Sequence, residues 1–223
     1  MAKKIRKHKG HPVTRRIFIL SPAYAGGRRA QMILRDNAQF DLAKKIRSEN
    51  GATITEVFTF LSGLYFRGKI AYANAFTSAT NGDCGVFVIT PTRGLVDARS
   101  TVTVDDLREF SAVDIDKADP RYRQPLERSV RRLADDLPAG SEVVLLGSIA
   151  TGKYIEIFLK YFEQRLCFPA DFVGRGDMSR GGLMLRCAAD RQELRYISVM
   201  GAIRNGRRPP KLEPRRYPKN SPI

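Results

Sequence analysis

Residues 142–154 read EVVLLGSIATGKY. The apolar run Val143–Leu146 is typical of a strand buried on both faces. Gly147–Lys153 then follows the pattern G-x-x-x-x-G-K, and residues 151–164 have the composition of a helix. A buried strand, a glycine-bounded loop and a helix form the unit from which α/β folds are built.

Similar units recur on both sides of this stretch. Apolar runs predict further strands at 16–21, 55–61 and 85–90, and spacing predicts helices at 29–48, 68–77, 104–110 and 121–137. Two runs near the end, 183–188 and 194–199, flank a polar connection and predict a hairpin. The sequence therefore predicts an α/β fold, a three-layer Rossmann-like mainly parallel sheet with a C-terminal β-hairpin.

The positive charge is unevenly distributed. The net charge is +16, of which +13 lies in residues 1–16 and 204–223 and +3 in the rest of the chain. We therefore expect a single domain at 16–203 between two basic arms, 1–15 and 204–223. Basic arms bind polyanions by neutralising phosphates, so nucleic acid, DNA or RNA, is the expected partner. The simpler alternative is that the arms only keep the protein in solution.

Several classes of site and location are disfavoured. The three cysteines form no CxxC, and both histidines, His8 and His11, lie in the N-terminal arm, so we expect no metal site and no cofactor. No long apolar segment suggests a signal peptide or a membrane span, so we expect a cytoplasmic protein without membrane contact.

Three strand ends carry small or polar residues. They are Ser21–Gly27, Thr90–Gly94 and Gly147–Tyr154. Ligands of parallel sheets bind beyond the carboxyl ends of the strands, so we expect these loops to meet in one crevice. The alternative is that glycine, serine and proline serve only as turn residues.

The loop at 147–154 suits a phosphate, because a glycine-bounded turn precedes a helix N-terminus. Tyr154 occupies the position of the magnesium-binding Ser or Thr of an NTPase, and no later strand ends in Asp. We therefore expect nucleotide or phosphate binding without NTP hydrolysis. The expected contacts here are Gly147, Ser148, Thr151, Lys153 and Tyr154, joined by Thr90 and Arg93 from the second loop.

Two further clusters contribute candidates. GRGDMSRGG at 174–182 has four glycines, arginines able to fork onto phosphate, and a carboxylate between them. It supplies Arg175, Ser179 and Arg180 for binding, or else it is a structural loop. SGLYFRGK at 62–69 interleaves aromatic and basic residues, which supplies Arg67 and Lys69 for the crevice or else contributes to the core.

With no histidine in residues 16–203, a general base must be a carboxylate or a lysine. The candidates are Asp177, Asp97 and Lys153, and Asp177 is favoured. Whether the protein is an enzyme is left open by the sequence.

The segments SGLYFRGKIAYA, ITPTRGLVD, LLGSIATGKY and GRGDMSRGGLML together resemble a family of uncharacterised bacterial proteins. More distantly, the chain resembles the Rossmann-like domains of the peroxide-stress DNA-binding, archaeosine-synthase and uracil-DNA-glycosylase-like type. The resemblance implies a pocket bordered by Gly147 and Tyr154 with Asp97 nearby. It does not imply glycosidic activity, because the glycosylase motifs are not visible, and fold likeness does not assign function.

The leading expectation is a nucleic-acid-associated protein with a nucleotide- or base-sized pocket. One alternative is an enzyme acting on a small phosphorylated or nucleoside metabolite. Another is a non-catalytic module of a larger nucleoprotein assembly.

Overall fold

The computed structural model describes residues 15–77 and 85–215. Its main sheet has six strands in the order β4-β3-β1-β6-β7-β8. The four central strands are parallel, whereas β4 and β8 run antiparallel to their neighbours at the two edges. The strand bounds are β1 Arg16–Leu20, β3 Val86–Thr90, β4 Gly94–Asp97, β6 Glu142–Leu146, β7 Leu166–Pro169 and β8 Tyr196–Ser198.

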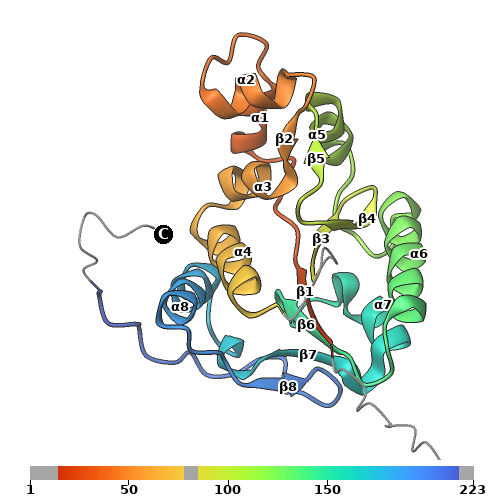
Figure 1. The fold of residues 1–223 in the computed structure, drawn as a ribbon, viewed down its shortest axis with the longest axis vertical. Coiled ribbons are helices and arrows are strands. Elements are labelled where there is room, and N and C mark those ends of the chain that lie inside the picture. Colours follow the sequence, from red (N-terminus) through yellow and green to blue (C-terminus); the bar gives the residue numbers. More distant parts are fainter. Residues whose placement is uncertain (1–14, 78–84, 216–223) are drawn as a thin grey trace, which may run out of the picture.

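The described residues contain eight α-helices. Figure 1 shows α4 and α8 on one side of the sheet and α6 and α7 on the other, which gives three layers. The helices α1, α2, α3 and α5 gather at one end with a small second sheet of β2 and β5. The bounds are α1 Arg28–Leu34, α2 Asp41–Arg47, β2 Ala52–Thr53, α3 Ile54–Ser62, α4 Leu64–Phe76, β5 Thr101–Val102, α5 Val104–Ser111, α6 Pro120–Asp136, α7 Gly152–Phe162 and α8 Asp177–Asp190. Short 3₁₀ turns lie at Glu163–Arg165 and Ala170–Phe172.

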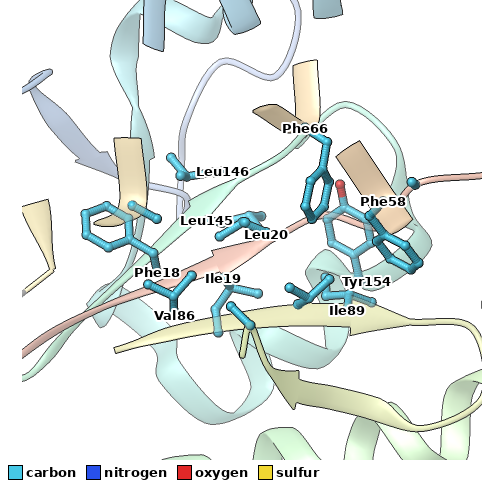
Figure 2. Packing of buried hydrophobic residues seen from close by; sticks show 14 of the residues in the cluster. Phe18, Ile19, Leu20, Phe58, Phe66, Val86, Ile89, Leu145, Leu146 and Tyr154 are labelled. Carbon is cyan, nitrogen blue, oxygen red and sulfur yellow. The ribbon is translucent and has the colours of Figure 1, made fainter. Parts of the chain in front are cut away.

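The centre of the core lies on β1 and β6. Ile17–Leu20 and Val143–Leu146 are completely buried, as the uninterrupted apolar runs predict for strands covered on both faces. Figure 2 shows part of this core, with Leu20 and Leu145 beside Phe66 of α4. The Phe66 ring meets that of Phe58 of α3 edge to face at 5.5 Å. Burying each such side chain contributes roughly 1.5–3 kcal/mol. The expected α/β class and mainly parallel Rossmann-like sheet are confirmed.

Three expectations for local structure were wrong. Residues 55–61 form α3 rather than a strand, because Thr53 and Glu56 make a capping box that starts a helix. Residues 29–48 form two helices, α1 and α2, separated by a bend at 35–40. The C-terminal antiparallel pair exists, but β8 pairs with β7, and residues 183–188 belong to α8.

Close packing of α4 against α8 explains two glycines. A Cβ built on Gly68 would lie 2.5 Å from the carbonyl oxygen of Gly181, and one built on Gly181 would lie 2.7 Å from that of Leu64. Only glycine permits this approach of the two backbones. The contact fixes α4, which carries Tyr65 and Lys69, against α8, which carries Asp177 and Arg180.

The described part of the C-terminal arm, 204–215, has no regular secondary structure and lies along α8. Arg175 donates to the carbonyl of Pro210, Arg186 donates to that of Glu213, and Arg215 pairs with Asp190 at 2.7 Å. Most of the N-terminal arm, residues 1–14, lies outside the described residues, as do 216–223. None of the described helices is long and apolar enough to cross a membrane.

Candidate functional site

The register of β1 and β6 brings two of the predicted loops together. Leu20 pairs with Leu146, so Ser21 and Gly147 come next to each other where the strands end. A Cβ on Gly147 would lie 2.7 Å from that of Ser21, so the close approach requires glycine. A cavity of about 780 Å³ opens at this point. Its lining comes from the β1 loop, α3, α4, the α5–α6 loop, the α7 loop and α8: Ser21, Pro22, Ala23, Tyr24, Ser62, Tyr65, Asp114, Ile115, Asp116, Lys117, Ser148, Thr151, Gly152, Lys153, Tyr154 and Asp177.

One wall of the cavity is the first turn of α7. Thr151 is the N-cap residue, but its side chain caps no backbone N–H, so the N–H groups of this turn are left for a ligand. Lys153 is exposed on the same turn and makes no ion pair within the described residues. Lys117 is also on the lining, but it is paired with Glu156 at 3.0 Å. This wall therefore suits one anionic group.

Tyr24 provides an exposed aromatic surface at the cavity. It is 66 % exposed, the highest value among the tyrosines of the core and cavity. Its side chain packs close to Gly26 and Gly27, where added Cβ atoms would lie 2.9 Å from its hydroxyl oxygen and 3.1 Å from its ring. An exposed ring on a cavity wall is suited to stacking with a planar ligand.

The floor carries two buried tyrosines. Tyr154 donates to the carbonyl of Ser148 at 2.9 Å, and burial raises its pKa above the usual range. Burial also raises the pKa of Tyr65 to about 12, against an opposing effect of Arg180. The Tyr65 hydroxyl is itself buried, next to Ser21 and Arg180, and makes no hydrogen bond of good geometry with either. Both phenols are neutral at physiological pH.

Lys69 is the least expected feature of the site. It is completely buried, and its Nζ lies 2.7 Å from the carbonyl oxygen and 2.9 Å from the Oγ of Ser21. Its Nζ also sits 4.3 Å from the centre of the Tyr65 ring. Burial lowers the pKa of Lys69 to about 7, while Asp177 raises it and Arg180 lowers it further. Lys69 thus lies behind Ser21 rather than on the cavity wall.

Only part of the cluster at 174–182 lies at the cavity, and the rest makes structural contacts. Asp177 lines the cavity at the start of α8 and lies 3.8 Å from Arg180. Arg180 donates to the carbonyl of Phe172 at 2.9 Å, and its side chain is only 11 % exposed. Arg175 donates to Asp171, Ser179 and Pro210, so Arg175 and Ser179 hold the C-terminal segment rather than the cavity.

Four other predicted residues lie away from the cavity. Thr90 is buried and closes the β3–β4 turn by donating to Gly94 at 2.9 Å, and Arg93 pairs with Asp106 and Glu109 of α5. This strand end turns back into antiparallel β4, so its loop does not join the other two.

The other two predicted residues also lie elsewhere. Asp97, at the end of β4, pairs with Arg99, and Arg67 is exposed on α4. Because 55–61 is a helix, Arg67 does not follow a strand end.

Several lining residues were missed from the sequence. Ser21 and Tyr24 stand in the loop that the strand-end rule had selected, and only their individual roles were not assigned. The α5–α6 loop, with Asp114, Asp116 and Lys117, carried no recognisable motif, since only the tertiary fold brings it to the cavity.

No group of three or more metal-ligating side chains occurs among residues 15–77 and 85–215. Cys167 and Cys187 are half-buried and unpaired, and burial raises the pKa of each thiol. Cys84 and both histidines lie outside the described residues.

The chain matches no protein-family model, no curated protein and no solved structure. The resemblance to Rossmann-like DNA-binding domains therefore stays a prediction, and the site is interpreted from its own geometry.

Proposed function

We propose that the cavity at the ends of β1 and β6 binds a nucleoside monophosphate or a single nucleotide of a nucleic acid. The observation that carries the proposal is the pairing of an exposed aromatic, Tyr24, with the uncapped first turn of α7 and Lys153 on one cavity. A base stacks on an aromatic ring, and a phosphate binds a helix N-terminus.

The charges of the lining favour a ligand with few negative charges. Asp114, Asp116 and Asp177 face the cavity with only two lysines, of which Lys117 is already paired. A triphosphate would meet repulsion from three carboxylates. A single phosphate on Lys153 leaves the carboxylates to accept hydrogen bonds from ribose hydroxyls or base amino groups.

The C-terminal arm supports contact with a polyanion. Exposed Arg204, Arg207, Arg208 and Lys211 lie on the segment that runs along α8. Their attraction to phosphates is independent of sequence, so the arm would supply attachment and the cavity selectivity.

Calorimetric titration with AMP and with adenosine tests the proposal. Tyr24→Ala removes the stacking surface and should weaken both ligands roughly 5- to 150-fold, from about 1–3 kcal/mol per stacked base. Tyr24→Phe keeps the ring and should bind as the parent protein does. Lys153→Met should weaken AMP about 10-fold, the loss expected for one charged hydrogen bond, and leave adenosine unchanged.

Lys160→Met is the matched control. Lys160 lies on the same helix but does not line the cavity, and its Nζ pairs with a Glu127 oxygen at a distance of 2.6 Å. Equal AMP affinity in the parent protein, Tyr24→Ala and Lys153→Met would contradict the proposal.

A further inference from the structure

Lys69 occupies an unusual position for a lysine. Its side chain is completely buried, it forms no ion pair within the described residues, and its polar contacts are the two oxygens of Ser21. Burying an unpaired ammonium is costly, which favours the neutral amine. The charged and titratable groups around it are Tyr65 on the same helix and Asp177 and Arg180 on α8.

The two contacts fit a neutral amine. The carbonyl oxygen of Ser21 only accepts, so Lys69 donates an N–H to it. In the structure Lys69 also donates to the Ser21 Oγ, at 2.9 Å. When the amine is neutral, its lone pair can instead accept the Ser21 hydroxyl proton across this contact. A hydroxyl held by a neutral amine in this way is the arrangement of an activated nucleophile.

Ser21 and Lys69 differ in their position relative to the cavity. Ser21 lies on the cavity lining, at the point where β1 ends, whereas Lys69 lies behind it in the core. Ser21 is itself only 7 % exposed, and the Lys69 amine lies 2.9 Å from its Oγ, so a group bound at Ser21 is also close to the amine. The phenols of Tyr65 and Tyr154 also lie beside the Ser21 side chain, and burial raises the pKa of both, so neither phenol ionises to take the proton.

We propose that Ser21 is a nucleophile with Lys69 as its general base, and that the site transfers the acyl group of an ester or activated acyl compound. This rests on the proposed function, because the acylated ligand would be a nucleoside or nucleotide in the same cavity. Phosphoryl transfer is disfavoured because it needs several cations around the phosphoryl oxygens, and the lining offers only Lys153 unpaired.

The step balances with the groups present and water. Ser21 Oγ attacks the acyl carbon while Lys69 Nζ takes the hydroxyl proton. Collapse of the tetrahedral intermediate breaks the bond to the leaving alcohol, which receives that proton. Water then attacks the Ser21 ester, passes one proton through Lys69 to Oγ, and releases the carboxylic acid.

Reaction with an alkyl fluorophosphonate, followed by intact mass and peptide mapping, tests this chemistry. Ser21 Oγ should attack phosphorus with loss of fluoride, giving one adduct on Ser21. The rate should rise with pH to a plateau, with a midpoint near the Lys69 pKa of about 7. Ser21→Ala should give no adduct, and Lys69→Met should slow labelling by about 10²- to 10⁴-fold.

Two controls lie outside the cavity. Ser111→Ala removes a half-buried serine of α5 that donates to the carbonyl of Arg108, and Lys160→Met removes a surface lysine of α7. Both variants should label as the parent protein does. Absence of a Ser21 adduct, or labelling of Lys69→Met at the parental rate, would overturn the proposal. If Lys69→Met does not fold, the pH profile of the parent protein decides, since a midpoint near 10 would equally overturn it.

AMP titration of the same samples separates the two proposals. AMP binding without labelling of Ser21 would reject the acyl-transfer proposal and retain the nucleotide-binding proposal. Labelling of Ser21 without AMP binding would reject nucleotide binding and retain Ser21 as a nucleophile.

Discussion

Replacing Gly181 with alanine tests how α4 and α8 are held together. The new Cβ would lie 2.7 Å from the carbonyl oxygen of Leu64 and 2.8 Å from the Cα of Tyr65. Both atoms belong to backbone, so no change of rotamer relieves the overlap and the helices must separate.

The magnitude follows from two opposing effects. Overpacking of this kind costs about 1–3 kcal/mol, and we expect the upper end because two backbones collide. The alanine returns about 1 kcal/mol through its better helix propensity. The net loss is therefore about 2 kcal/mol, which lowers the Tm of a domain this size by roughly 4–8 °C.

Gly182→Ala is a matched control on the next residue of the same helix. There the nearest atom to a new Cβ is Cδ1 of Leu212 at 3.7 Å, an ordinary contact. This variant should be as stable as the parent protein or up to about 1 kcal/mol more stable. Urea unfolding of the two variants compares them directly. Equal stability of Gly181→Ala and Gly182→Ala would refute the packing argument.

Three other changes give distinct expectations. The pKa of Lys69 is about 7 in the folded protein and 10.5 ordinarily, so the unfolded chain binds more protons between these pH values and the contribution of Lys69 to stability rises with pH there. Urea unfolding from pH 7 to 9.5 should show this rise in the parent protein relative to Lys69→Met. Parallel stability curves for the two proteins would contradict it. Arg93→Ala should leave AMP affinity unchanged in calorimetry, since Arg93 pairs with Asp106 and Glu109 away from the cavity, and a large loss of affinity would place the β3–β4 turn in the site. Deleting 204–223 should weaken binding to single-stranded DNA and flatten its dependence on salt without changing AMP affinity; an unchanged salt slope would remove the C-terminal arm from polyanion binding.

The strands were the most predictable part of this fold. Ile17–Leu20 and Val143–Leu146 are continuous apolar runs, and such runs are stable only where both faces of a sheet are covered. Residues 55–61 have similar composition, but the capping box of Thr53 and Glu56 directs them into α3. That signal stood in the sequence: Thr53 lies just before the run, and Glu56 follows it three residues later, as the second residue of the run.

The site was predicted at the level of loops rather than of side chains. The strand-end rule selected the loops after β1 and β6, and the register of Leu20 with Leu146 brings them together. It also selected Thr90–Gly94, because nothing local showed that this end turns back into an antiparallel strand. Lys69 appeared as a crevice lysine, whereas its burial behind Ser21 depends on how α4 docks on the sheet.

A crystal structure of the protein with AMP tests the proposed site most directly. We expect the adenine ring to stack on Tyr24 and the phosphate to lie at the first turn of α7 beside Lys153, with Ser21 facing the ligand. AMP bound along Arg204–Lys211, or at any position that leaves the cavity at the ends of β1 and β6 unoccupied, would contradict it.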